Sequence, residues 1–509
     1  MLSARGLSPL SVFAAMALAG SAAGAQTPAP VAPVTTAATR WERGVRIGGE
    51  YQIRGNLMGD IPLRALPRTD PATTGRLGQN LWGNQWLRLR GEAVFRENLK
   101  LTAQMDVVNG VAFGDLAQGV APQALRSDEY GYPGVRFRYL YMDWETPIGL
   151  LRVGQMGFSW GLGIVANDGD TPTVFGDYRY GDLVRRVMIA TRPLGRTNPL
   201  VVALAGDWVA TDLLADYERR DELAFQGILA AYWGEGENRV GAYGVYRWQE
   251  NRLADTLTAF FVDVYARWGF RDSRGGWNFA AVEAAFATGS TTYARTVESP
   301  EQAVRQFMAV LQLGRKSPTW DVVLEGGYAS GDANSEDAVQ GRATIDPDHR
   351  VGLILFPEVL AANTARAAQL AQDPALSARA ARGSELIPTN GGVAGAGYLF
   401  PYGIYRPVRW LEMRVGAVLA FSSTDVVDPY AQRALSRTVN WRGGNSGARD
   451  LGFEVDGAVL VNHPIADNLV LSGGVEGGVF LPGGAFTDEN GQGMSPIGLA
   501  RLRIGLRYR

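Results

Sequence analysis

The final segment of the chain, ARLRIGLRYR, places arginine and apolar residues at alternate positions. Arg501, Arg503 and Arg507 alternate with leucine, isoleucine and tyrosine. Successive side chains of a β-strand point to opposite faces, so these arginines are expected to share one face of a strand. Guanidinium groups stay charged at any working pH and pair with planar anions. The pattern therefore indicates recognition of carboxylates or phosphates.

The same alternation recurs through the chain, for example in WLRLRGEAVFR, where charged residues alternate with leucine, alanine and phenylalanine. Further carboxylates are predicted on the charged face at Asp106, Asp143, Glu283, Glu325 and Glu476. Arginines and carboxylates that share a face also pair across strands simply to satisfy one another, and this alternative applies to each arginine singly. The residues that we predict to line a common charged face are Arg88, Arg90, Glu92, Arg96, Arg152, Arg186, Arg247, Arg267, Arg414, Glu454, Asp456, Arg501, Arg503 and Arg507.

Residues for catalysis or metal binding are scarce. The chain has no cysteine and two histidines, His349 and His463. A cysteine or histidine-rich metal site is therefore excluded, and neither histidine has a convincing nucleophile or acid beside it on a strand. Calcium in the acidic segments DANSEDAV and DPDHR is a weaker alternative, because neither segment has EF-hand spacing. We predict no enzyme activity, no metal and no cofactor.

Composition argues against a nucleic-acid partner. Lysine occurs only at Lys100 and Lys316, so nearly all basic residues are arginine, but the formal net charge is −2. A chain with this balance has no overall basic field.

The N-terminus is typical of a secreted protein. Arg5 precedes the apolar stretch VFAAMALAG, and Ala23-Gly24-Ala25 fits a signal-peptidase site. We predict a signal peptide over residues 1–25 and a flexible Pro/Ala/Thr-rich lead-in over residues 26–40, because the latter has too few large apolar residues to pack.

The elements that position the charged face are expected to be membrane-spanning strands. No later window supplies the roughly 18 consecutive apolar residues of a membrane-spanning helix. Each predicted strand is long enough for the roughly 9–11 residues of a tilted spanning strand. The eighteen strands are predicted at residues 43–56, 84–97, 99–113, 135–146, 149–163, 182–193, 199–211, 222–234, 238–250, 256–270, 276–289, 304–315, 320–331, 395–407, 411–423, 450–463, 468–481 and 496–509.

The connections between these strands alternate in length. Even-numbered ones are short, such as GEGEN and HPIADN, whereas most odd-numbered ones are long, such as residues 57–83 and 114–134. Short periplasmic turns and long extracellular loops are typical of outer-membrane barrels. An even strand count also lets the last strand pair with the first, which leaves no sheet edge in lipid. We predict an all-β, antiparallel up-and-down transmembrane barrel over residues 41–509, in the bacterial outer membrane.

The longest connection, residues 332–394, is predicted to be an extracellular insertion. It is far longer than an ordinary loop, and its middle, from Val351 to about Gln372, has the composition of a helix. The apolar VGLILF within it needs a place to pack, and the pore interior or mouth is the nearest one. The insertion is therefore a candidate plug or gate, with an extracellular cap that only stabilises the rim as the alternative.

Tryptophans near the strand ends fit the aromatic girdles of a membrane barrel, although core packing is an equal alternative. They are Trp82, Trp86, Trp144, Trp233, Trp248, Trp268, Trp277, Trp320 and Trp410.

Several short motifs resemble the outer-membrane alginate-export family, or a related group of porin-like proteins. They are YASGD, DPDHRVGLILF, FEVDGAVL, FLPGGAF and YLYMDWETPIGLLRVGQMGFSWGLG. The resemblance implies an eighteen-stranded barrel whose arginine-lined lumen passes an acidic polysaccharide to the cell exterior.

Together these observations predict an outer-membrane pore for anionic, saccharide-like substrates or a small anionic solute. Its expected partners are the outer-membrane bilayer and, for export, periplasmic proteins. The alternatives are a general diffusion porin, a plugged structural or adhesion barrel, and an outer-membrane enzyme.

Overall fold

A computed structural model describes residues 41–64, 80–114, 135–176, 181–195, 197–374, 376 and 382–508. The predicted signal peptide, residues 1–25, and the lead-in, residues 26–40, lie outside the described residues, as does Arg509.

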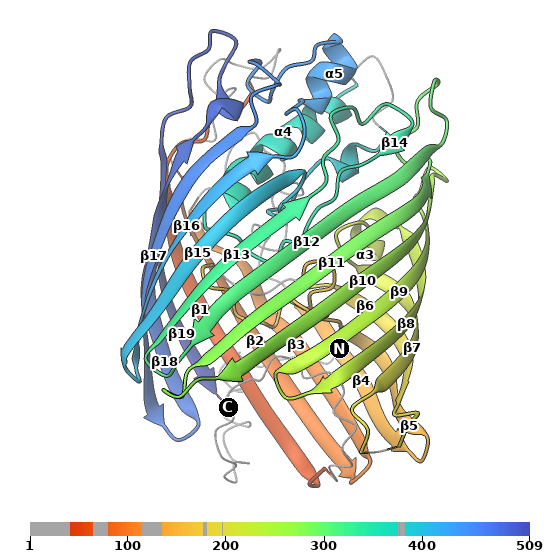
Figure 1. The fold of residues 1–509 in the computed structure, drawn as a ribbon, viewed down its shortest axis with the longest axis vertical. Helices are drawn as coiled ribbons and strands as arrows, with labels where there is room; N and C mark the ends of the chain where they lie inside the picture. Colours follow the sequence, from red (N-terminus) through yellow and green to blue (C-terminus); the bar gives the residue numbers. More distant parts are fainter. Residues whose placement is uncertain are drawn as a thin grey trace, which may run out of the picture.

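The chain forms a closed antiparallel β-barrel (Figure 1). Each wall strand pairs with the next along the chain, and β19 pairs with β1, which closes the cylinder. The wall strands are β1 (Gly44–Met58), β2 (Asn80–Arg96), β3 (Leu99–Gly114), β4 (Arg136–Thr146), β5 (Gly149–Gly157), β6 (Leu183–Thr191), β7 (Val201–Thr211), β8 (Leu223–Glu235), β9 (Asn238–Glu250), β10 (Thr256–Arg271), β11 (Trp277–Thr291), β12 (Gln302–Lys316), β13 (Trp320–Ala329), β15 (Ala396–Val408), β16 (Leu411–Ser422), β17 (Asp450–Ala466), β18 (Leu469–Pro482) and β19 (Ile497–Tyr508).

These are the eighteen predicted strands, and the predicted fold class is confirmed. The remaining strand, β14 (Val339–Gln340), is a short parallel addition to β12. Most predicted boundaries differ from the observed ones by a few residues, and the largest error is in the strand expected over residues 149–163, which ends at Gly157. Beyond that point Gly161 and Gly163 adopt left-handed conformations, with φ of 57° and 77°, which are not those of an extended strand.

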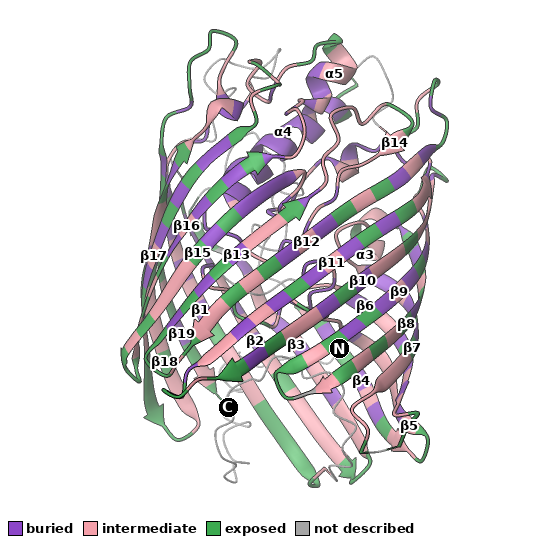
Figure 2. Ribbon diagram, viewed as in Figure 1, coloured by how far each residue is buried: buried purple, intermediate pink, exposed green. Residues whose placement is uncertain are grey.

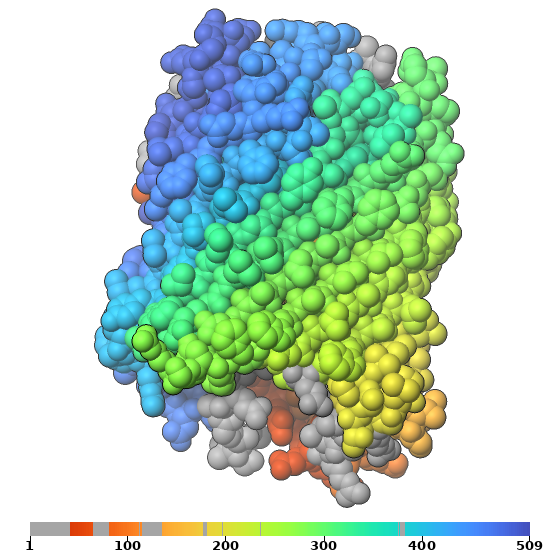
Figure 3. Space-filling view, viewed as in Figure 1, coloured from red at the N-terminus to blue at the C-terminus, as the bar shows by residue number. Residues whose placement is uncertain are grey.

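Buried and exposed residues alternate along the wall strands (Figure 2), and the residues on the two faces of the wall differ in polarity. On β19, Leu502 and Ile504 are 53% and 52% exposed on the outside, whereas Arg501 is 3% exposed on the inside. The same alternation runs round the barrel, so apolar side chains are exposed on its outside, such as those of Leu204, Phe260 and Val415. Figure 3 shows the side chains of neighbouring strands packed side by side over one face of the wall. A closed barrel with this apolar outer band spans a lipid bilayer, and in bacteria that bilayer is the outer membrane. No helix in the described part of the chain is long and apolar enough to cross a membrane.

The tryptophans divide between the two faces. Trp233 and Trp268, at 56% and 61% exposure, lie on the outside as expected for a girdle. Trp82 and Trp86, at 4% and 2% exposure, are buried instead, and Trp86 donates to Gln52 across β1 and β2. Trp82 and Trp86 therefore pack in the interior, which was the alternative to a place in the girdle.

The wall begins and ends at the end of the barrel where the turns are short. Gly44 of β1 pairs with Val94, beside the turn between β2 and β3, and Tyr508 of β19 pairs with Leu469, beside the turn between β17 and β18. The short helices occur at or near the opposite end, within the long connections. They are α3 (Tyr217–Arg220), the π-helix η3 (Leu355–Leu360), α4 (Ala361–Gln372), the 3-10 helix η4 (Ser384–Leu386), α5 (Pro429–Leu435) and the 3-10 helix η5 (Gly484–Phe486).

Candidate pore and the two segments inside it

The predicted arginines on the inner wall form ion pairs with wall carboxylates. Arg88 Nε lies 2.8 Å from Asp106, and both Nε and Nη2 of Arg186 lie 2.7 Å from the oxygens of Asp207. Arg501 lies 2.9 Å from Glu476. Further pairs join Arg152 to Asp143 at 2.6 Å and Arg507 to Glu50 at 2.8 Å.

The other predicted arginines vary more in their surroundings. Arg247 lies 2.5 Å from Asp212, Arg414 lies 2.6 Å from Glu412, and Arg267 lies 3.1 Å from Glu237 and stacks on Phe279. Arg90 is more exposed and lies 3.0 Å from Glu92, and Arg503 is half-buried.

Arg96 stands apart from this group. It is exposed at the turn end of β2, where a register shift sets it opposite Leu99.

The ion pairs between arginines and carboxylates affect which sign of ion the lumen would prefer. An arginine held bidentate by a buried carboxylate has its charge compensated and its donors occupied. The lumen wall is therefore a mosaic of both signs rather than a basic surface. Most of these arginines therefore fit the alternative given for each arginine singly, in which it pairs with a carboxylate across strands.

A segment that follows β5, residues 158–176, folds into the lumen and is here called the inner loop. At one side of the barrel, Asp170 accepts from Arg88 and from Tyr139, each at 2.7 Å. Arg138, buried on β4, donates to the Asp168 carbonyl at 2.6 Å.

Further round the wall, Arg414 on β16 donates to the Thr173 carbonyl at 3.1 Å, and Gly176 N–H donates to Glu476 on β18 at 3.3 Å. Other residues of the inner loop contact β9 and β11, half-way round the barrel from β2, so the inner loop crosses the lumen.

The middle of the inner loop is also fixed to the wall. Leu162 N–H donates to the Glu283 carboxylate on β11, and Trp160 packs edge-on against Tyr243 of β9 with ring centres 5.0 Å apart. Burial, together with neighbouring Asp170, raises the pKa of Asp168 to about 6. The alternating sequence pattern predicts that residues 158–163 belong to a wall strand, and it gives them no role inside the lumen. The paired glycines Gly161 and Gly163 are the signal that could have shown the break.

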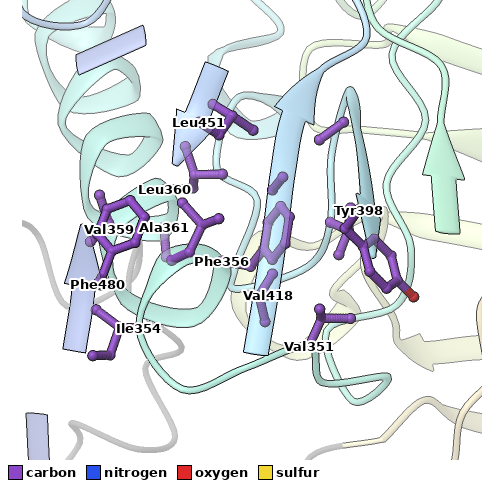
Figure 4. Close-up of a cluster of buried hydrophobic side chains, with 14 of the residues drawn as sticks. Val351, Ile354, Phe356, Val359, Leu360, Ala361, Tyr398, Val418, Leu451 and Phe480 are labelled. Carbon is purple, nitrogen blue, oxygen red and sulfur yellow. The ribbon is translucent and has the colours of Figure 1, made fainter. Parts of the chain in front are cut away.

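The described residues of the insertion, 332–374, 376 and 382–394, lie inside the barrel at its long-loop end (Figure 1). The predicted helix from Val351 begins at Leu355, as η3 followed directly by α4. Phe356 and Leu355 are fully buried, and Figure 4 shows η3 and α4 packed against wall residues of β15 to β18, among them Tyr398, Val418 and Phe480. The apolar VGLILF stretch thus packs in the lumen.

Glu454 on β17 holds the start of this helical segment. Its carboxylate accepts from the backbone N–H groups of Leu353, Ile354 and Leu355 at 2.6, 2.8 and 2.7 Å. Gly352 precedes them with φ of 69°, and a Cβ there would lie 2.7 Å from Glu454 Oε1. Only glycine fits this approach without a shift of the carboxylate. Asp456 lies two residues further along the same inner face, where it is also buried.

The inner loop and the insertion meet at His349. Its Nδ1 lies 3.0 Å from the Leu162 carbonyl, and its Nε2 lies 3.1 Å from Glu325 of β13, which also accepts from Tyr398 at 2.7 Å. Burial lowers the pKa of His349, but Glu325 and the Leu162 carbonyl outweigh burial, so the pKa lies above its usual value. Asp346 N–H donates to the Ile164 carbonyl at 2.8 Å beside this contact.

A cavity of about 350 Å³ remains between the insertion and the wall strands β6 to β12. The wall contributes Arg186, Arg247 and Tyr243, and the insertion contributes Arg342 and Asp346. The cavity is large enough for a small solute and too small for a folded polymer.

Comparisons with known proteins found similarity only among solved structures. No family model matches the chain, and no curated protein matches it, so the resemblance to the alginate-export family finds no support there.

Among solved structures, the chain is similar to Pseudomonas aeruginosa OccK5 (OpdH), at 9% identity and a TM-score of 0.47 over 91% of this chain and 98% of that one. It is also similar to Acinetobacter baumannii OccAB1, at 9% identity and a TM-score of 0.47 over 91% and 96%. A third is Pseudomonas aeruginosa OprD, at 8% identity and 0.46 over 92% and 97%. Likeness at this level says nothing of substrate.

Proposed function

We propose that the chain is an outer-membrane channel of the porin type that passes small polar solutes down their gradients. The observation that carries this proposal is the narrowed lumen, in which two inward-folded segments leave a mixed-charge cavity of about 350 Å³ against the wall of β6 to β12. A lumen lined by paired charges of both signs is hydrated, but it has little reason to prefer one sign of ion.

This proposal favours the general diffusion porin over the exporter of an anionic polysaccharide. The polysaccharide hypothesis requires arginines that are free to bind successive carboxylates. Arg88, Arg186 and Arg501 instead each face a wall carboxylate within 3 Å. A pathway for a polymer would also require the inner loop to leave the lumen. This movement would break the ion pair between Arg88 and Asp170.

The test is single-channel conductance of the refolded chain without residues 1–25 in a planar bilayer, with the reversal potential measured under a KCl gradient. A modest conductance with weak selectivity supports the proposal. Strong anion selectivity, together with liposome permeability to uronic-acid oligomers, would instead support the polysaccharide hypothesis.

A closed structural barrel is a second candidate, favoured by the dense packing of η3 and α4 inside the lumen. It predicts no conductance from folded protein, both for the full chain and after removal of residues 340–392. Conductance that appears only after that removal would identify the insertion as a gate.

A further inference from the structure

Arg185 occupies an unusual place on the outer wall. Arg185 on β6 lies opposite Trp208 on β7. The row continues with Phe225 on β8 and Trp248 on β9. Phe225 is 47% exposed, so this row of side chains faces lipid. The row lies two residues from the long-loop end of the wall, since β6 begins at Leu183 and β8 at Leu223.

Aromatic rings hold the Arg185 guanidinium in this row. Its central carbon lies 4.4 Å from the ring centre of Trp208 and 5.7 Å from that of Tyr217 in α3. Trp208 and Tyr217 pack edge-on with ring centres 4.9 Å apart. The cation is therefore placed by a rigid aromatic platform, which costs less entropy than a free arginine would on binding an anion.

The next residue along the chain provides a direct contrast. Arg186 points into the lumen and is held by both oxygens of Asp207. Across the described ranges of the chain, no carboxylate lies within ion-pair distance of Arg185. An uncompensated charge on a lipid-facing surface is costly unless an anion meets it, and aromatic belts lie at the depth of the lipid headgroups.

We propose that Arg185, on the platform of Trp208 and Tyr217, binds a phosphate group of a lipid headgroup in the outer leaflet. Basic residues beside a membrane interface attract anionic headgroups by about 1 kcal/mol each. A guanidinium also donates two parallel hydrogen bonds to a phosphate.

The charged residues near this row limit how large an anion can bind at Arg185. Arg220 lies 3.0 Å from Glu222, and Arg252 lies 3.2 Å from Asp221, so both are engaged by carboxylates. Arg219 is 48% exposed with Asp216 at 3.9 Å, and Glu218 is exposed on the same helix. This balance of charge suits one phosphate rather than an extended polyanion, and it makes binding depend on Arg185.

The experiment uses the refolded chain in lipid nanodiscs that contain either a bisphosphorylated glycolipid or its dephosphorylated form, with retained lipid counted by native mass spectrometry. We expect the wild-type chain to retain the phosphorylated form. Arg185→Gln should weaken this retention about fivefold, the equivalent of about 1 kcal/mol. Trp208→Leu should weaken it less, because the cation remains but loses its platform.

Arg449→Gln is the matched control. Arg449 lies in a long connection near the same end of the barrel and has 54% side-chain exposure, but unlike Arg185 it is paired with a carboxylate, Asp425, at 2.7 Å. Its loss should leave retention unchanged, and millimolar inorganic phosphate should not displace the lipid. Equal retention of the dephosphorylated lipid by the wild type, or unchanged retention by Arg185→Gln, would overturn the proposal, as would displacement by free phosphate.

Discussion

The inner loop and the insertion both fill the lumen, but different interactions hold them. The inner loop is held at separate points of the wall by hydrogen bonds and ion pairs, from Arg88 and Tyr139 at one side to Glu283 at the other. The insertion buries a continuous apolar surface against β15 to β18, and the carboxylates Glu454, Glu325 and Asp255 add polar contacts to it at Leu353, His349 and Arg382.

This difference predicts different behaviour. Apolar packing is non-directional and loses strength gradually as a segment moves, whereas a buried ion pair fails at once when its partners separate. The insertion is therefore the segment able to shift as a body, and the inner loop is the fixed constriction below it. The three predictions that follow test this contrast, from the largest expected effect to the smallest.

The apolar anchor of the insertion is the first target. Phe356 is 0% exposed and packs edge-on against Tyr398 with ring centres 6.1 Å apart. Phe356→Ala should lower the free energy of unfolding by about 3–5 kcal/mol, because the cavity cannot close fully. Urea unfolding in detergent, followed by tryptophan fluorescence, measures this loss.

The control for that variant is Phe286→Ala, which removes the same group from the lipid-facing side of β11, where Phe286 is 48% exposed. Its cost should be much smaller. Equal losses in the two variants would show that the insertion contributes little to stability.

The polar anchor of the inner loop is the second target. Arg88→Met removes a cation that contacts Asp106 at 2.8 Å and Asp170 at 2.7 Å. The two carboxylates would be left beside each other, so we expect a loss of about 3 kcal/mol. Amide hydrogen exchange should show lost protection in residues 158–176 and unchanged protection in η3 and α4. Loss of protection in both segments would mean that they move as one unit.

The junction between the segments gives the smallest effect, and it depends on pH. The pKa of His349 is raised above 6.5, because Glu325 and the Leu162 carbonyl outweigh burial. A raised pKa means that the charged form stabilises the fold, fully below about pH 6.5, and that this contribution is lost as the pH rises through the higher folded value. Stability should therefore fall as the pH rises above about 6.5.

His349→Gln should remove this slope, measured as the urea midpoint at each pH. Asp168, with a pKa of about 6, is mostly ionised in that pH range and contributes little to the slope. An unchanged slope in His349→Gln would assign the effect to another group.

Much of the wall could be predicted from the sequence, because alternation is a local property. The boundaries of β9 match the predicted 238–250, and β16 matches 411–423 within one residue. The prediction failed after Gly157, where Trp160 and Leu162 continue an alternating pattern although the chain has left the wall. Alternation marks which side chains share a face, but it does not show whether that face belongs to the barrel or to a segment inside it.

The sequence by itself determined the closed barrel, the lipid-facing and lumen-facing sides of its strands, and the presence of a long insertion with an apolar stretch. Only the tertiary structure decided which carboxylate meets each arginine, that residues 158–176 cross the lumen, and that Arg185 lies against the rings of Trp208 and Tyr217. The reason is physical. A period of two residues fixes the direction of a side chain locally, whereas its partner depends on the register between strands that are distant in the chain.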